Sequence, residues 1–251
     1  EISPLFYGGV PQHPNVRAIP FPDTYRPMNG LTGEALLNAY LAKVQAAIDD
    51  FAEKNIPFAG MLLCSIFANE GLPNPPQGFL KRAVEIVRAA GGLFISDEVQ
   101  AGFGRTGKMW GFEFGDVVPD IVTLGKPIGN GHPLAAVVAR PELINQFRDQ
   151  VMYFNTFAGN PVSCAVGNAV LDVMDKEKLQ ENAENVGNYI RQQLKTLRQE
   201  LPIIGDVRGH GLWIGIELVK DADTKKPATD AAKQVINQLK ERGVLTGRIG
   251  P

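Results

Sequence analysis

The sequence predicts an α/β protein in which a mainly parallel sheet with flanking helices is followed by a small, incomplete α+β domain. Short apolar runs, each the length of one strand, alternate with stretches of helical periodicity. After residue 175 this alternation gives way to long helical stretches and two neighbouring strands. The chain has 251 residues, 44% hydrophobic and 21% charged, which is enough to bury a sizeable core.

The first predicted domain, residues 1–175, binds its ligands at one edge of the sheet. It opens with about thirty irregular residues rich in Pro and Gly. The elements that follow are helices at 33–54 and 79–90 and strands at 58–64, 93–96, 121–124 and 134–139. Apolar strands separated by helices are typical of a parallel sheet buried on both faces, and ligands of such sheets gather beyond the carboxyl ends of the strands.

The second predicted domain, residues 176–251, is smaller and of the α+β type. A helix at 161–174 leads into it, and the expected elements are helices at 179–201 and 228–242 and strands at 203–207 and 212–219. Because the chain stops soon after the last helix, we expect this domain to be incomplete.

Composition argues against several classes of partner and site. A net charge of -2 without a long basic run does not favour nucleic acid or a membrane surface. No signal peptide or bilayer-spanning run is apparent, so we expect a cytoplasmic protein. Cys64 and Cys164 lie in apolar stretches and are expected to be core thiols in a reducing compartment. The three histidines lie far apart, which argues against a metal site.

Two charged residues follow predicted strands at the ligand-binding edge. Asp97 comes directly after the strand at 93–96, and Lys126 lies between Gly125 and Pro127 after the strand at 121–124. A carboxylate there either serves a ligand or caps nearby backbone N–H groups. A lysine there is either desolvated, which favours a nucleophilic amine, or packs its stem on the loop while its head reaches water.

Other motifs are weaker by themselves. Gly102, Gly104 and Gly107 have the spacing of a dinucleotide-binding loop, but no helical pattern follows them, so a plain glycine-rich loop is favoured. His132 lies in a tight turn and is expected to be structural. Thr156 precedes a helix that opens at Asn160, where hydroxyl and N–H groups suit an anion or simply cap the helix.

Taken together, three segments resemble the class III aminotransferases, which depend on pyridoxal phosphate. They are residues 95–107 (ISDEVQAGFGRTG), 119–126 (PDIVTLGK) and 155–161 (NTFAGNP), in matching order and spacing. The resemblance covers nearly the whole chain, and residues 205–209 (GDVRG) look like the start of the family's small domain. Residues 125–133 and 153–163 are most similar to the branch of alanine-glyoxylate aminotransferase 2-like proteins and ethanolamine-phosphate phospho-lyases.

The resemblance implies a fold type I transferase and a role for each matching residue. Lys126 would be the Schiff-base lysine, and Asp97 would hold the pyridine nitrogen of the cofactor protonated. Val99 would pack on the face of the ring, and Gln100 would reach its hydroxyl. Thr156 would bind the cofactor phosphate of the neighbouring subunit, which implies a homodimer with shared active sites.

The activity that the resemblance implies is transfer of an amino group between an amine or amino acid and a keto acid or aldehyde. One alternative is a phospho-lyase acting on phosphoethanolamine or phosphohydroxylysine. Another is a non-catalytic dimerising homologue. The family's glycine-serine phosphate loop and ring-stacking aromatic residue would lie upstream of Glu1, so the first domain is expected to lack its N-terminal part.

Overall fold

A four-stranded sheet organises the larger part of the chain in this computed structural model, which describes residues 13–249. The outer ends of both predicted domains, residues 1–12 and 250–251, lie outside the described residues. The strand order is β1-β2-β3-β4, with bounds Gly60–Leu63, Leu93–Asp97, Ile121–Leu124 and Ala136–Ala139. β1, β2 and β3 are parallel and β4 is antiparallel to β3. The predicted α/β class with a mainly parallel sheet is confirmed.

The direction of β4 follows from the short connection before it. After β3 the chain makes one turn of 3-10 helix, Lys126–Gly129, and a tight turn in which the His132 N–H donates to the Gly129 carbonyl at 2.9 Å. A parallel return to the sheet needs a crossover of a dozen or more residues, usually a helix. With no such crossover, the strand returns antiparallel.

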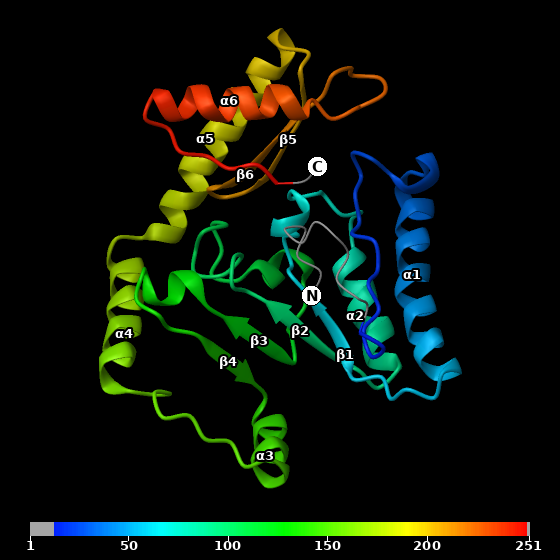
Figure 1. Ribbon diagram of the computed structural model, residues 1–251, viewed down its shortest axis with the longest axis vertical. Helices are drawn as coiled ribbons and strands as arrows, with labels where there is room; N and C mark the ends of the chain where they lie inside the picture. The colour runs from blue at the N-terminus through cyan, green and yellow to red at the C-terminus, as the bar shows by residue number, and fades with distance from the viewer. Residues whose placement is uncertain (1–12, 250–251) are drawn as a thin grey trace.

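Two helices cover one face of the sheet in successive layers (Figure 1). α2 (Phe79–Ala89) lies on β1 and β2, and α1 (Gly33–Glu53) packs against the outer side of α2. Their apolar stripes meet in one core, in which Tyr40 and Phe79 form an edge-to-face pair 6.3 Å apart and Phe94 of β2 is fully buried. This core holds the strand ends in place.

The opposite face of the sheet differs from the expectation that both faces are buried. Leu62 of β1 is 50% exposed, and Val137 of β4, which points to the same face, is 62% exposed. Neither α1 nor α2 reaches this face, because both lie on the other side of β1 and β2. For this part of the sheet the prediction was wrong.

Two helices follow β4 before the second lobe. α3 (Pro141–Gln150) was not predicted, although Leu143, Ile144 and Phe147 lie at helical spacing, and it buries none of its residues. It begins with Pro141 at its first position, where the missing N–H costs nothing, and has Glu142 near its start and Arg148 near its end, as the helix dipole favours. α4 spans Pro161–Lys176.

The small lobe combines a two-stranded antiparallel sheet with two helices (Figure 1). Its elements are α5 (Leu179–Glu200), β5 (Ile204–His210), β6 (Trp213–Leu218) and α6 (Thr229–Glu241). α5 packs on β5 and α6 on β6. Because α5 packs on this hairpin rather than on the large sheet, we propose that the predicted boundary between residues 175 and 176 divides the two domains.

Contacts join the lobes at several places, two of which are near Arg26 and Gly211. Arg26, before α1, donates to the Glu217 carboxylate of β6 at 2.7 Å and to the Lys225 carbonyl at 2.8 Å. At the second place the Leu212 N–H donates to the Arg105 carbonyl at 3.0 Å. Gly211 is required there, since its φ is +49° and a Cβ would lie 2.4 Å from the backbone of Thr106.

Candidate active site

The parallel register brings the two predicted charged residues to one edge of the sheet. Asp97 is the last residue of β2 and lies opposite Thr123 of β3, and Lys126 follows three residues later. Parallel neighbours end at the same edge, so both residues lie beyond the carboxyl ends of adjacent strands.

Asp97 uses one carboxylate oxygen locally. Its Oδ1 accepts the backbone N–H of Val99 at 3.0 Å, a turn that aspartate commonly makes with the residue two positions on. Capping of a backbone N–H, one of the two roles expected for this carboxylate, therefore accounts for Oδ1 alone. The structure records no hydrogen bond to its Oδ2 within residues 13–249, so this oxygen is available to a ligand.

Val99 connects the turn after Asp97 to the turn that contains Lys126. A Cβ built on Gly125 would lie 3.5 Å from Val99 Cγ1, an ordinary van der Waals contact. The Val99 side chain thus packs against the peptide that precedes Lys126. The next residue, Gln100, donates from Nε2 to Asn69 Oδ1 at 2.8 Å.

Lys126 has a constrained backbone and an exposed side chain. Its φ is +44°, in the left-handed region, which destabilises a non-glycine residue by about 1 kcal/mol or more. Of the two environments that the sequence left open for this lysine, the structure shows the exposed one. The amine makes no hydrogen bond or ion pair to residues 13–249.

The fully buried carboxylate at the end of β2 belongs to Glu98 rather than Asp97. Glu98 is 1% exposed and accepts the Gly111 N–H at 2.6 Å, the Ser96 hydroxyl at 2.8 Å and the Phe112 N–H at 3.1 Å. Burial raises its pKa above the usual range, and these hydrogen bonds offset part of that rise. Glu98 therefore anchors the loop that follows Asp97.

The alternation of side chains between the two faces of a strand could have revealed from the sequence that Glu98 is buried. Phe94, Ser96 and Glu98 share the buried face of β2, whereas Asp97 points to the other face.

His132 joins the turn after Lys126 to the start of α4. Its Nε2 lies 2.8 Å from the Ser163 hydroxyl, and the Asn160 side chain caps α4 by accepting the Ser163 N–H at 2.9 Å. This contact is consistent with the structural role predicted for His132.

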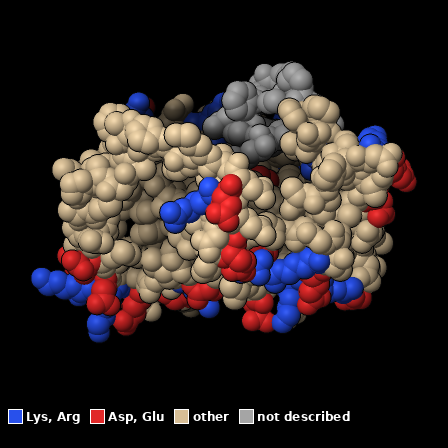
Figure 2. Space-filling view, turned by 90° about the horizontal axis from the view of Figure 1, so that it is seen from below, with Lys and Arg blue, Asp and Glu red and all other residues tan. Residues whose placement is uncertain are grey.

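Thr156 lies in a segment, residues 151–159, whose members are all exposed. Its neighbours Phe154 and Phe157 are each 79% exposed and Met152 is 97% exposed. Figure 2 views the molecule from the side of α3, and much of that surface carries no Lys, Arg, Asp or Glu side chain. The structure does not bring Thr156 into hydrogen-bonding contact with the other predicted site residues.

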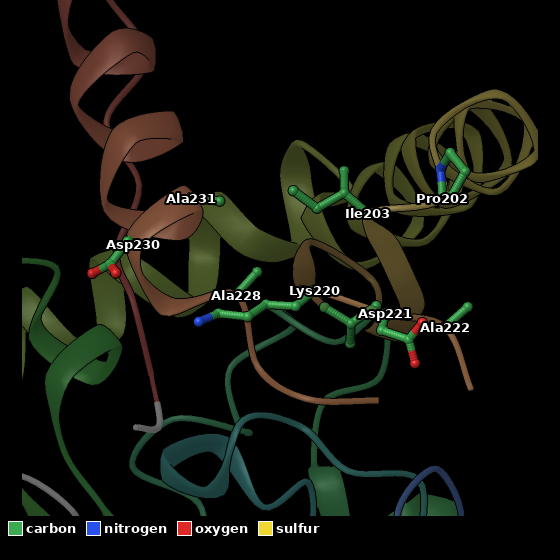
Figure 3. A pocket seen from close by; sticks show the side chains of 9 residues that line it. Pro202, Ile203, Lys220, Asp221, Ala222, Ala228, Asp230 and Ala231 are labelled. Atoms are coloured by element: carbon green, nitrogen blue, oxygen red, sulfur yellow. The ribbon is translucent and has the colours of Figure 1, made fainter. Parts of the chain in front are cut away.

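A cavity of about 530 Å³ in the small lobe is separate from this site. Figure 3 shows its lining: Pro202 and Ile203 before β5, Lys220 to Ala222 after β6, and Asp230 near the start of α6. Neither Asp97 nor Lys126 contributes to it, and we assign it no role.

Within residues 13–249, no group of three or more His, Cys, Asp or Glu side chains could hold a metal ion. None of the helices in this range combines the length and apolar character that crossing a membrane requires. Cys64 and Cys164 are free thiols. Burial raises the pKa of Cys64 to about 11, whereas Cys164 is exposed on α4, so its expected core position was wrong.

Comparison with known proteins shows the family. The sequence model of the family described as Aminotransferase class-III matches residues 6–251. The chain belongs to the class III aminotransferase family. This membership confirms the resemblance carried by residues 95–107, 119–126 and 155–161, and the solved structures of the family confirm the fold type I assignment.

Among relatives of this class III chain is the mitochondrial alanine-glyoxylate aminotransferase 2 homolog 2 of Arabidopsis thaliana. It is 48% identical over 229 residues, which are 91% of this chain and 46% of that protein. The human mitochondrial alanine-glyoxylate aminotransferase 2 is 46% identical over 211 residues, 83% of this chain and 41% of the human protein. The chain thus spans about half the length of these relatives.

A solved structure with the same fold is a phospholyase from Arthrobacter in complex with phosphoethanolamine. Its TM-score is 0.91 and its identity 45%, covering 96% of this chain and 57% of that chain. The comparisons also correct one expectation. The plant and human relatives carry mitochondrial names, which contradicts the expected cytoplasmic location.

Proposed function

We propose that the protein containing this chain is a pyridoxal-phosphate-dependent aminotransferase that moves an amino group between an amine or amino acid and a keto acid or aldehyde. Family membership supports the reaction class. The observation that carries the assignment to residues is the placement of Asp97 and Lys126 beyond the ends of the neighbouring parallel strands β2 and β3.

The residues present fit this cofactor. Asp97 has one carboxylate oxygen without a partner among the described residues, as an acceptor for a ring N–H requires. Val99 packs against Gly125, which precedes Lys126, and offers an apolar surface for a ring. The exposed amine of Lys126 is accessible to an aldehyde. Gln100 adds a polar group next to Val99.

Each residue would make a distinct contribution. When bound, pyridoxal phosphate supplies an electron-withdrawing ring that stabilises the negative charge left when the substrate loses its Cα proton. Asp97 would hold a proton on the ring nitrogen, because a carboxylate nearby favours the charged form of that nitrogen. Lys126 would bind the cofactor aldehyde and, once released by substrate, would take the Cα proton and return it.

We also propose that the protein is a homodimer in which Thr156 of one subunit binds the cofactor phosphate of the other. The exposed apolar side chains around Thr156, Met152, Phe154 and Phe157, support a covered position in the assembly. Light scattering of the purified protein measures the subunit number. A monomer that binds pyridoxal phosphate as tightly as a dimer would contradict this proposal.

Reduction with borohydride tests the cofactor assignment. The protein encoded by the longest reading frame that contains this chain is incubated with pyridoxal phosphate and reduced. It is then digested and analysed by mass spectrometry. We expect the pyridoxyl mass on Lys126, its loss in Lys126→Ala, and its retention in the matched control Lys108→Ala, which alters another exposed lysine. A colourless protein without any adduct would instead support the non-catalytic dimerising homologue.

A phospho-lyase is the second candidate, favoured by the 45% identity to the Arthrobacter phospholyase. Both activities start with removal of the same Cα proton. They differ in whether the proton returns to the cofactor side or a phosphate leaves the substrate. Incubation with phosphoethanolamine separates the two. Release of inorganic phosphate without a keto acid would establish the lyase, and amino transfer that needs a keto acid would establish the aminotransferase.

A further inference from the structure

We propose that Asn69 is a positioning residue of the cofactor site, which orients the side-chain amide of Gln100. The inference rests on the proposed function and on the contact between Gln100 and the ring hydroxyl that the family resemblance implies. Its basis is the 2.8 Å hydrogen bond from Gln100 Nε2 to Asn69 Oδ1, between half-buried side chains 31 residues apart in the sequence.

The turn that carries Asn69 is held in a strained conformation. Phe67 and Leu72, on either side of Asn69, have φ of 49° and 59°, in the left-handed region that bulky residues rarely adopt. The Phe67 N–H donates to the Cys64 carbonyl at 2.9 Å, and the Leu72 N–H donates to the Phe67 carbonyl at 3.0 Å. Strain of this kind persists only where the surroundings impose it, and it clusters at functional sites.

The small lobe holds the same turn from the other side. Arg208 of β5 donates from Nε to the Gly71 carbonyl at 2.8 Å and from Nη2 to Glu217 Oε2 at 2.7 Å. Its side chain is only 10% exposed. The position of Asn69 is therefore fixed by the end of β1 and by the small lobe together.

A fixed acceptor decides how the Gln100 amide is turned. The amide nitrogen carries two hydrogens in one plane, so the bond to Asn69 sets the direction of the second. That second N–H is left to donate to an oxygen, such as the ring hydroxyl of the cofactor. Without Asn69 the side chain would lose rotamer freedom each time it binds, which weakens binding.

The experiment measures cofactor affinity rather than turnover. Four variants are made in the protein encoded by the longest reading frame that contains this chain: Asn69→Leu, Asn69→Asp, Gln100→Leu and the double variant Asn69→Leu/Gln100→Leu. Asn74→Leu is the matched control, since Asn74 is exposed. The dissociation constant of pyridoxal phosphate is measured by absorbance titration, and the pH midpoint of the visible band of the bound cofactor is recorded.

We expect Asn69→Leu to weaken cofactor binding about five- to tenfold, the effect of one hydrogen bond, and to shift the pH midpoint. Asn69→Asp keeps the acceptor and should stay within about twofold of the parent protein. Since Asn69 acts through Gln100, the double variant should match Gln100→Leu. If Asn69→Leu does not fold, Asn69→Ala is measured in its place.

Two results would overturn the role of Asn69. One is unchanged affinity and midpoint in Asn69→Leu, and the other is additive losses in the double variant. A parent protein without a Lys126 adduct would refute the proposed function instead, so the two failures can be told apart.

Discussion

Replacing Glu217 with glutamine tests whether one carboxylate holds the small lobe against the rest of the chain. Glu217 accepts hydrogen bonds from Arg26 and Arg208, each at 2.7 Å, through different carboxylate oxygens. Glutamine keeps a single acceptor oxygen and turns an NH2 group toward the other guanidinium. The substitution therefore removes one charge-assisted bond and weakens the other.

The expected loss can be worked out from the exposure of each pair. The Arg208 and Glu217 side chains are 10% and 15% exposed, so this arm contributes about 2 kcal/mol, as hydrogen bonds to charged groups do. Arg26 is 36% exposed, so its arm is screened by water and contributes less than about 1 kcal/mol. We expect Glu217→Gln to lower the free energy of unfolding by about 2–3 kcal/mol, with a Tm lower by about 5–10 °C.

The pH dependence of this loss has a definite sign. Burial alone would raise the pKa of Glu217, but the hydrogen bonds from Arg26 and Arg208 outweigh it, so the pKa lies below its usual value. The folded state then binds this proton more weakly than the unfolded chain does. The stabilisation is fully present above the ordinary glutamate pKa of about 4.3 and is lost as the pH falls through the lowered value.

Urea unfolding followed by circular dichroism measures both effects. The two proteins are compared at pH 7 and at steps down to about pH 3, and the difference between them should shrink below about pH 4. Glu200→Gln is the control, because Glu200 is exposed on α5, and its effect should stay within about 0.5 kcal/mol. A difference for Glu217→Gln below about 0.5 kcal/mol at pH 7, or one independent of pH, would refute the reasoning.

Three further predictions concern other parts of the chain. Because the pKa of Cys64 is about 11, only about one thousandth of this thiol is thiolate at pH 8, and iodoacetamide should label it only after the protein unfolds. Rapid labelling of the native protein, measured by mass spectrometry, would contradict this prediction. Burial and the nearby Arg191 lower the pKa of His210, which stacks on Phe114 with ring centroids 4.0 Å apart. Its contribution to stability is present above about pH 6.5 and lost on acidification, so His210→Phe should make unfolding less sensitive to pH between about 6.5 and 5; equal sensitivity would count against it. Gly187→Ala places a Cβ 1.9 Å from the Gly211 carbonyl oxygen and should lower the free energy of unfolding by about 2 kcal/mol or more, which thermal unfolding measures. The control is Gly243→Ala, where the Cβ meets open space and the φ of +82° alone costs about 1 kcal/mol.

Local patterns in the sequence sufficed for most of the secondary structure. The helix predicted at 33–54 is α1, and the strand predicted at 121–124 has the bounds of β3. The helix has apolar residues at helical spacing and the strand is a short apolar run, and both signals depend on residues only a few positions apart. α3 was missed although Leu143, Ile144 and Phe147 lie at helical spacing. The sequence also placed Asp97 and Lys126 at strand ends, since a motif position is a local property.

Contacts between distant segments could not be read in this way. The bond between Asn69 and Gln100 joins residues 31 apart, and the one between Arg26 and Glu217 joins residues 191 apart. They exist only because the strand register and the packing of the lobes bring these side chains together.

What the sequence by itself determined was the family, the order of the elements and the two charged residues at the ends of β2 and β3. Only the tertiary structure decided that Glu98 is the buried carboxylate, that Lys126 is exposed and that one face of the sheet carries uncovered apolar side chains. The physical reason is that burial depends on which segments fold over a residue. Residue type and local spacing limit that choice without fixing it.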